Sequence, residues 1–194
     1  FWLPTYPFTD GGRKKRVDGK LCSDTGLPLV EQLRELELSS RELEERKIVL
    51  VVKLHPFQDS QAVHIGGFSH IVLLEHDALA GNDIQVNQLL GRADALISDY
   101  SSAAVDYLIL DRPMAFIVDD LEGYSEGRGF IFEKVLDWLP GKQVQNVEEL
   151  LSFIEEIGAG CDSTKEKRLE LRAKMHAYGD GSNCKRILER LGVV

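Results

Sequence analysis

The sequence of 194 residues is poor in cysteine, in long apolar runs and in positive charge. Its three cysteines are widely spaced and form no Cys-x-x-Cys pair, which argues against a disulfide framework and indicates reduced thiols without a metal role. No window approaches the ~18 apolar residues of a membrane span, and no segment has the order of a signal peptide. The net charge of −9 repels nucleic acid and anionic lipid, so we expect no nucleic-acid partner.

Several motifs of nucleotide enzymes and hydrolases are also missing. The sequence has no G-x-x-x-x-G-K-[ST] loop, no G-x-G-x-x-G after its first apolar run and no G-x-S-x-G turn. These absences argue against a P-loop nucleoside triphosphatase, a dinucleotide dehydrogenase and an α/β-hydrolase. The histidines show no H-E-x-x-H or other metal spacing, so we expect neither a metal site nor a cofactor, and any divalent ion would arrive with the substrate.

The apolar runs that are present predict an α/β fold. They are continuous, rich in Val, Ile and Phe and free of alternation, which is typical of strands buried on both faces of a parallel sheet. These runs cover residues 1–6, 47–55, 70–75, 95–100 and 114–119. Amphipathic helical patterns fill most gaps between them and continue to the end of the chain. We therefore expect one doubly wound, mostly parallel, Rossmann-like domain over residues 1–194.

One apolar run breaks off into Asp99-Tyr100-Ser101-Ser102 and then resumes as a helical pattern. In the expected topology the two serines fall between the carboxyl end of a strand and the start of a helix, where unpaired amides can hold a phosphate. Two interpretations remain open: a phosphate site at Ser101 and Ser102, or simple helix capping by one serine. Asp99 is expected to form the turn or a cap, and not to act as an acid.

A second strand ends in Lys53-Leu54-His55-Pro56. Pro56 disfavours a helical conformation at His55, so the imidazole should project from the same edge of the sheet as the serines. A histidine at a strand end can be structural, but here it could also transfer a proton or stabilise a phosphate. Lys53 lies at the same strand end and is expected to contact the phosphates of an anionic ligand.

Three further segments could meet an anionic ligand. Arg13 begins the only dense basic cluster, in a polar loop that is either solvated or a substrate contact. In the segment 122–133, glycines permit a tight backbone path on which Arg128 could bind a phosphate, although an ordinary glycine-rich turn explains the pattern equally well. Ser182 lies before the last helical pattern, where it could bind an anion or cap the helix.

Taken together, these segments resemble the C-terminal half of the CDP-glycerol glycerophosphotransferases, the teichoic-acid polymerase family of GT-B proteins. The resemblance is carried, in the order of the family, by residues 3–6, 53–56, 93–116, 127–133 and 180–187. It implies a Rossmann-like half of a GT-B fold that binds CDP-glycerol. In the family, glycerol phosphate passes to the hydroxyl of a growing polymer and CMP is released.

The resemblance also implies roles for single residues. Ser101 and Ser102 look like pyrophosphate ligands, Asp106 like a residue that faces the glycerol end of the donor, and His55 like one of two important histidines. The other histidine belongs to the N-terminal half, which this sequence lacks, so we expect the chain alone to be inactive. In the family, an Arg-Asp pair usually follows the opening motif closely, whereas the first arginine of this sequence is Arg13. Whether the loop that contains Arg13 recognises the base therefore stays open.

The expected function is therefore that of a donor-binding domain whose partners are CDP-glycerol and a polymer acceptor. Two alternatives remain open: another GT-B polyol-phosphate or sugar transferase, and a nucleotide-binding module without catalysis. The resemblance implies a cytoplasmic location, with contact to the inner face of the membrane through the missing part of the protein. The chain opens on "FWLPTY" without an initiating Met, as expected for a piece of a longer protein.

Overall fold

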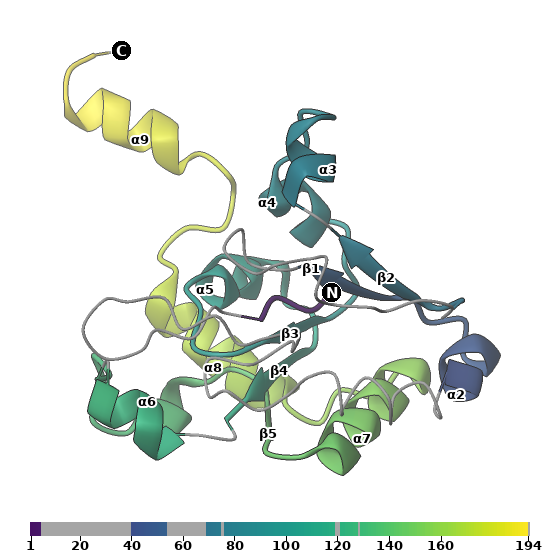
Figure 1. Cartoon of the computed structure of the whole chain (residues 1–194). Helices are drawn as coiled ribbons and strands as arrows, with labels where there is room; N and C mark the ends of the chain where they lie inside the picture. The colour runs from purple at the N-terminus through teal and green to yellow at the C-terminus, as the bar shows by residue number, and fades with distance from the viewer. Residues whose placement is uncertain (5–39, 54–68, 75, 119–120, 128, 194) are drawn as a thin grey trace.

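A computed structural model describes residues 1–4, 40–53, 69–74, 76–118, 121–127 and 129–193 (Figure 1). In this part of the chain, the strands are β1 (Leu50–Lys53), β2 (Ile71–Leu74), β3 (Leu96–Ser98), β4 (Met114–Ile117) and β5 (Lys142–Val144). Every pairing between them is parallel. Such pairing requires crossover connections, and the helices supply them.

The first three residues join two groups of strands into one sheet. β1 pairs with β2, and β4 pairs with both β3 and β5. Trp2 lies between the groups and forms parallel bridges to Val52 of β1 and Ile97 of β3. The spatial order is therefore β2, β1, residues 1–3, β3, β4, β5, which is 3-2-1-4-5-6 in order along the chain. This is the order of a doubly wound dinucleotide-binding sheet, and the predicted fold class is confirmed.

All five apolar runs predicted as strands contribute to this sheet, the first of them through Trp2. The Trp2 amide donates to the Val51 carbonyl at 2.7 Å, and the Trp2 carbonyl accepts from the Lys53 amide at 2.9 Å. The part of this run after residue 4 lies outside the described residues. The sequence does not predict β5, because Lys142–Val144 is short and begins with two polar residues.

The helices largely follow the predicted patterns. Their bounds are α2 Ser40–Glu45, α3 His76–Ala80, α4 Val86–Leu90, α5 Ala103–Tyr107, α6 Leu121–Gly127, α7 Val147–Gly158, α8 Lys165–Met175 and α9 Asn183–Arg190, with 3-10 turns η3 Leu108–Leu110 and η4 Val135–Trp138. Asn146 caps the start of α7, since its side-chain oxygen accepts from the Glu149 amide at 2.9 Å. Most of the helical pattern before α2 lies outside the described residues.

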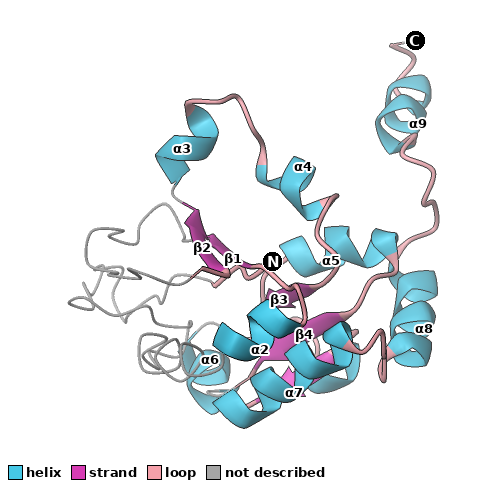
Figure 2. Ribbon diagram, turned by 90° about the vertical axis from the view of Figure 1, so that its right-hand side faces the viewer, coloured by secondary structure: helices cyan, strands magenta, loops and turns pink. Residues whose placement is uncertain are grey.

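The sheet is buried on both faces, as its uniformly apolar strands require. Leu96 and Ile97 are neighbours in β3 and enter opposite core clusters, because side chains alternate along a strand. Ile97 packs in the cluster that includes Phe153 of α7, whereas Leu96 packs with Phe116 and Tyr107 under α5. Figure 2 shows α7 and α5 on different sides of the sheet, so the domain has the three layers of a doubly wound fold.

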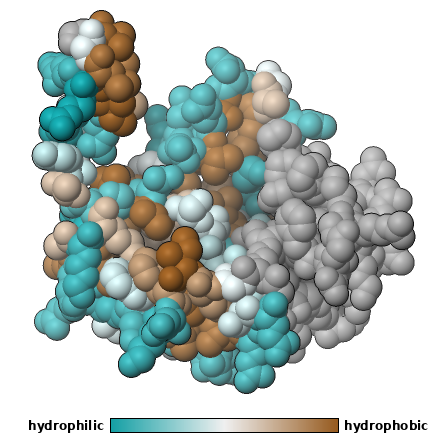
Figure 3. Space-filling model, turned by 90° about the vertical axis from the view of Figure 1, so that its left-hand side faces the viewer, coloured by the Kyte–Doolittle hydropathy of each residue, from teal (hydrophilic) through white to brown (hydrophobic). Residues whose placement is uncertain are grey.

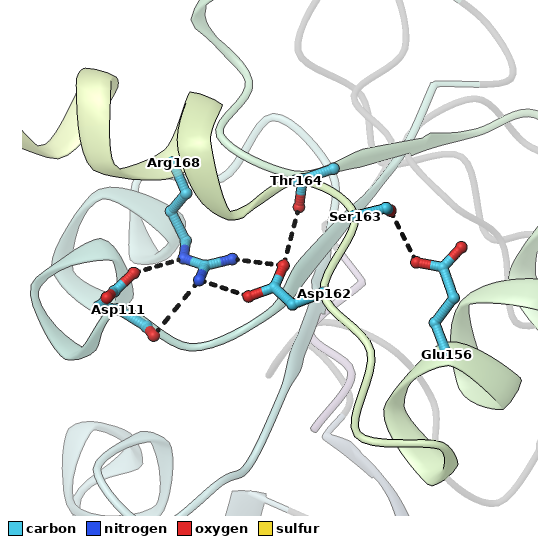
Figure 4. A network of polar contacts seen from close by, with 6 residues as sticks. All are labelled: Asp111, Glu156, Asp162, Ser163, Thr164 and Arg168. Atoms are coloured by element: carbon cyan, nitrogen blue, oxygen red, sulfur yellow. Dashed lines mark hydrogen bonds and ion pairs between the residues drawn. The ribbon is translucent and has the colours of Figure 1, made fainter.

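Residues 110–113, the Leu-Asp-Arg-Pro stretch just before β4, connect α8 to the sheet through ion pairs and hydrogen bonds. Arg168 of α8 is 1% exposed, and its guanidinium binds the Asp111 carboxylate at 2.9 Å and the Asp162 carboxylate at 2.6 Å (Figure 4). Arg112 donates to the carbonyls of Gly91 and Ala93 at the end of α4. These contacts lie at the amino end of β4, opposite the edge expected to bind ligands, so this stretch has a structural role.

The last helix, α9, buries none of its residues. In both ribbon views it stands clear of the sheet (Figures 1 and 2). Its apolar side chains Ile187, Leu188 and Leu191 are all exposed. Among the described residues, no helix combines the length and the apolar character needed to cross a membrane.

Candidate functional site

The candidate site lies where β3 ends and α5 begins. The topological switch point of this sheet falls between residues 1–3 and β3, because the strand order reverses there. Open α/β sheets bind ligands outside the carboxyl ends of the strands at such a point. Asp99 to Ser102 form the turn that leaves β3 at this edge, so the sequence-predicted serine pair occupies the position that the topology favours.

Side chains within the turn fix its shape. Asp99 is 3% exposed, and its carboxylate accepts a hydrogen bond from the Ser101 amide at 3.1 Å. Ser101 in turn uses its hydroxyl oxygen to accept from the Ala103 amide at 3.3 Å. Both are the short-range side-chain to backbone bonds that Asp and Ser favour in turns. The predicted role of Asp99 as a turn former is confirmed.

The same hydrogen bonds correct one expectation about the serine pair. We expected the pair to leave the amides at the start of the helix open to a phosphate, but the amides of Ser101 and Ala103 are already bonded within the turn. Ser102 is exposed and occupies the cap position of α5, yet its side chain makes no capping bond to another described residue. At this turn the Ser102 side chain is therefore more open to an approaching group than the amides of Ser101 and Ala103.

Lys53 ends β1 at the same edge of the sheet. Lys53 is 6% exposed, and burial lowers the pKa of its ammonium group. Residues 1–3 separate β1 from β3, so the backbones of Lys53 and Ser98 are about two strand spacings, roughly 9–10 Å, apart. A polyvalent anion could therefore approach both the lysine and the serine turn, and its charge would offset the cost of burying the ammonium group.

Asp106 and Ser182 lie on two different helices. Asp106 is exposed on α5, four residues after Ser102, so the two positions share one face of that helix. Ser182 lies at the start of α9, and its amide donates to the Asp180 carboxylate at 3.1 Å. Arg186 also binds Asp180 and lowers the pKa of that carboxyl to about 2. The structure brings Asp106 near the serine pair, whereas Ser182 belongs to the helix that stands clear of the sheet.

Three predicted site residues, His55, Arg13 and Arg128, lie outside the described residues, and their roles stay predictions. Within the described part of the chain, no group of three or more His, Cys, Asp or Glu side chains could hold a metal ion.

The first part of the glycine-containing segment after β4 is helical. Residues Leu121–Gly127 form α6, which the sequence did not predict. The turn follows immediately, because Gly129 has φ of 72° and its amide donates to the Tyr124 carbonyl at 3.1 Å. A positive φ suits glycine at the end of a helix.

The structure also contains a cavity that the sequence analysis missed. It has a volume of about 270 Å³ and adjoins the serine pair. Six aromatic side chains line it: Tyr100, Phe116, Tyr124, Phe130, Phe132 and Trp138. They come from the end of β3, from β4, from α6, from the loop after it and from η4, so no periodic pattern in the sequence could have grouped them.

Comparison with known proteins identifies the family. Residues 27–192 match the family model described as CDP-Glycerol:Poly(glycerophosphate) glycerophosphotransferase. The chain is 29% identical over 157 residues to the teichoic acid ribitol-phosphate polymerase TarK of Staphylococcus aureus, covering 81% of this chain and 29% of TarK. It is also 29% identical over 148 residues to the teichoic acid glycerol-phosphate primase of Bacillus subtilis, covering 69% of this chain and 37% of the primase.

A solved structure has the same fold. The wall teichoic acid polymerase TagF superposes with a TM-score of 0.64 at 24% identity, and the match covers 98% of this chain and 42% of that one. The chain thus spans well under half the length of these relatives. The family match covers most of the chain, including the serine pair, and the chain belongs to the CDP-glycerol:poly(glycerophosphate) glycerophosphotransferase family.

Proposed function

We propose that this chain is the donor-binding domain of a transferase that moves glycerol phosphate from CDP-glycerol to the hydroxyl end of a teichoic-acid-like or capsular polymer, releasing CMP. Family membership supports the reaction class. The observation that carries the assignment to this domain is the serine pair, which lies at the switch point of the sheet with the Ser102 side chain exposed. The polymerase and primase activities belong to relatives much longer than this chain, so catalysis requires more than these residues.

In this proposal the pyrophosphate of the donor lies against Ser101 and Ser102. Their hydroxyl groups donate to phosphate oxygens, and Lys53 supplies a positive charge from the neighbouring strand end. Asp106 faces the polyol end of the donor. Arg13, Arg128 and Ser182 remain proposed contacts to the nucleotide or its phosphates.

The reaction is a phosphoryl transfer, in which positioning and charge stabilisation provide most of the rate. An acceptor hydroxyl attacks the phosphorus on the glycerol side, a new P–O bond forms, and the bond to the oxygen of the departing CMP breaks. The serine turn and Lys53 stabilise the charge that accumulates on the leaving phosphate. His55 either accepts the proton of the attacking hydroxyl or donates to the leaving phosphate.

Ribitol phosphate is the second candidate for the transferred group. TarK is named a ribitol-phosphate polymerase, whereas the Bacillus subtilis protein is named a glycerol-phosphate primase, and both are 29% identical to this chain. The two donors share the nucleotide and the pyrophosphate and differ only in the polyol. The residues around Asp106 are therefore expected to decide between them.

Ligand-dependent stability is the direct test, because it does not require turnover. We expect CDP-glycerol or CDP-ribitol to raise the free energy of unfolding by about 2.7 kcal/mol at a hundredfold excess over Kd, and UDP-sugars to have no effect. The double variant Ser101→Ala/Ser102→Ala should lose this response. Ser163→Ala is the matched control, since Ser163 is also exposed but bonds to Glu156 away from the site.

Three outcomes contradict the proposal in different ways. If no cytidine nucleotide stabilises the protein, this domain does not bind the donor. If the serine double variant responds like the wild type, the pyrophosphate lies elsewhere. If UDP-sugars stabilise the protein as well as CDP-glycerol does, the chain belongs to a sugar transferase.

A further inference from the structure

One hydrogen bond connects α8 to α5, the helix that follows the serine turn. His176 lies at the end of α8, and its ring nitrogen Nε2 is 2.8 Å from the carbonyl oxygen of Val105 in α5. A carbonyl oxygen can only accept a hydrogen bond, so the imidazole must carry a proton on Nε2 and donate it. The bond joins two segments that are 71 positions apart in the sequence, and it gives a role to a histidine that no motif singled out.

α8 is a firm support for this bond, because buried contacts hold it. Its Arg168 side chain binds the Asp111 carboxylate just after η3, and Leu171 is buried in the core. His176 lies about 12 Å further along the helix and bonds to Val105, which precedes Asp111 in the chain. α8 therefore runs antiparallel to α5 and η3, and both ribbon views show α5 and α8 side by side (Figures 1 and 2).

The chain leaves the domain directly after His176. α9 buries none of its residues, and in the space-filling view it projects from the body of the molecule (Figure 3). Because α9 is not packed against the domain, it cannot hold the end of α8 in place. That end is held by α8 itself and by the hydrogen bond from His176 to α5.

α5 depends on contacts of this kind because it is short. It contains only five residues, and a helix of that length is not stable without tertiary support. Its inner face is held by Ala104 and Tyr107, which are buried, and the Tyr107 hydroxyl donates to the Ala93 carbonyl at 2.8 Å. Its outer face carries Val105, which is 40% exposed, and Asp106, which is exposed. The histidine bond fixes the backbone between these two outer residues.

The geometry of the peptide bond carries the effect from Val105 to Asp106. The Val105 carbonyl and the Asp106 amide belong to one planar peptide group, so a bond to the oxygen also restrains the nitrogen and the Cα atom of Asp106. In the proposed function, on which this inference rests, Asp106 faces the polyol end of the donor. We infer that His176 is a positioning residue, which fixes the backbone of Asp106 and so sets where its carboxylate meets the polyol.

Hydrogen exchange tests the positioning directly and needs no ligand. In His176→Leu the amides of α5 should exchange about 2- to 12-fold faster than in the wild type, the range expected for loss of one hydrogen bond. His176→Gln should restore the slow exchange, because the glutamine amide nitrogen can take the place of Nε2 as a donor. His70→Leu is the matched control, since the His70 ring bonds to Ser69 just before β2, the outermost strand of its sheet.

The tautomer of His176 provides a spectroscopic test. Long-range correlations between the ring nitrogens and the carbon-bound protons distinguish the two neutral forms of a histidine by NMR. We expect the neutral ring of His176 to carry its proton on Nε2, and the signal is assigned by its absence in His176→Gln. A proton on Nδ1 alone would leave Nε2 unable to donate and would overturn the inference.

Binding of two ligands tests the consequence for the site. CDP-glycerol contains the polyol, whereas CDP lacks it. By calorimetry, His176→Leu should weaken binding of CDP-glycerol by about 2- to 12-fold and leave binding of CDP unchanged, because Asp99 holds the serine turn separately. His176→Gln should bind CDP-glycerol like the wild type. A general loss of structure would weaken both ligands equally, and one donor group would not restore it.

The outcomes separate this inference from the proposed function. If α5 exchanges at the wild-type rate in His176→Leu, or if this variant binds both ligands like the wild type, His176 does not position Asp106 and the inference is overturned. Equal weakening of both ligands would also overturn it. If the wild-type protein binds neither CDP nor CDP-glycerol, the proposed function fails, and the exchange experiment still decides whether His176 fixes α5.

Discussion

The carboxylate of Asp99 accepts a hydrogen bond from the amide of Ser101 at 3.1 Å, and this bond stabilises the turn that contains the serine pair. Asp99→Ala should leave that amide without its acceptor and lower the free energy of unfolding by about 1–3 kcal/mol. Asp99→Asn retains a side-chain oxygen and should cost much less. Urea denaturation of both variants measures the difference.

The comparison of these two variants also separates a turn former from a catalytic acid. If Asp99 acts through the turn, Asp99→Asn should keep CDP binding near the wild-type value, whereas Asp99→Ala should weaken it together with stability. Equal losses in both variants would contradict a role that depends on one acceptor oxygen.

Lys53 is expected to contribute its positive charge to donor binding. Lys53→Met should weaken CDP binding by about 1.5–3 kcal/mol, the value of a hydrogen bond to a charged group. Thermal denaturation with and without CDP separates this loss of binding from any change in stability. A variant that is less stable but binds normally would show that Lys53 is structural.

Features that depend on neighbouring residues could be predicted from the sequence, whereas features that depend on contacts between distant segments could not. Strands such as β4 and the Asn146 cap of α7 are visible in the sequence, because continuous apolar runs and short-range caps are local signals. The serine turn was also predictable in position, since the order of strands places it at the switch point. Its bonded amides were not, because the hydrogen bonds of Asp99 and Ser101 depend on the exact path of the turn.

Features made by contacts between distant segments escaped prediction. α6 forms although its sequence contains glycines, and Tyr124 on this helix packs against Tyr100 at the end of β3. Phe132 and Trp138 meet in the same way, on segments that give no periodic signal. The aromatic cavity is thus a product of tertiary packing, which overrides local propensity.

Arg168 should be among the most sensitive positions for stability. Its buried guanidinium binds the carboxylates of Asp111 and Asp162, so Arg168→Met leaves both acids without their partner. Breaking a buried ion pair in this way costs about 3–5 kcal/mol. Lys185→Met is a suitable control, because its pair with Glu189 is exposed at 3.8 Å and should change stability by less than about 1 kcal/mol. Urea denaturation would measure both, and equal effects would contradict the structural role of Arg168.

The same ion pair predicts a dependence of stability on pH. The hydrogen bond that Asp162 accepts from Arg168 lowers the pKa of Asp162 in the folded state. A carboxyl with a lowered pKa stabilises the fold above its unfolded pKa of about 3.9, and this stability is lost as the pH falls through the folded value. Wild-type protein should therefore lose stability below about pH 4, and Arg168→Met should lose less over the same range. Parallel curves for the two proteins would show that Asp162 does not depend on Arg168.

Removal of α9 tests whether Ser182 belongs to the site. Because α9 buries none of its residues, ending the chain after Tyr178 should change the melting temperature by no more than about 2 °C. A donor contact from Ser182 requires CDP affinity to fall in this shortened protein and in Ser182→Ala alike. If the shortened protein is as stable as the full chain and binds CDP equally well, Ser182 has only the local role that its bond to Asp180 gives it. A large loss of stability would instead show that α9 packs on the domain in solution, and only Ser182→Ala would then report on the site.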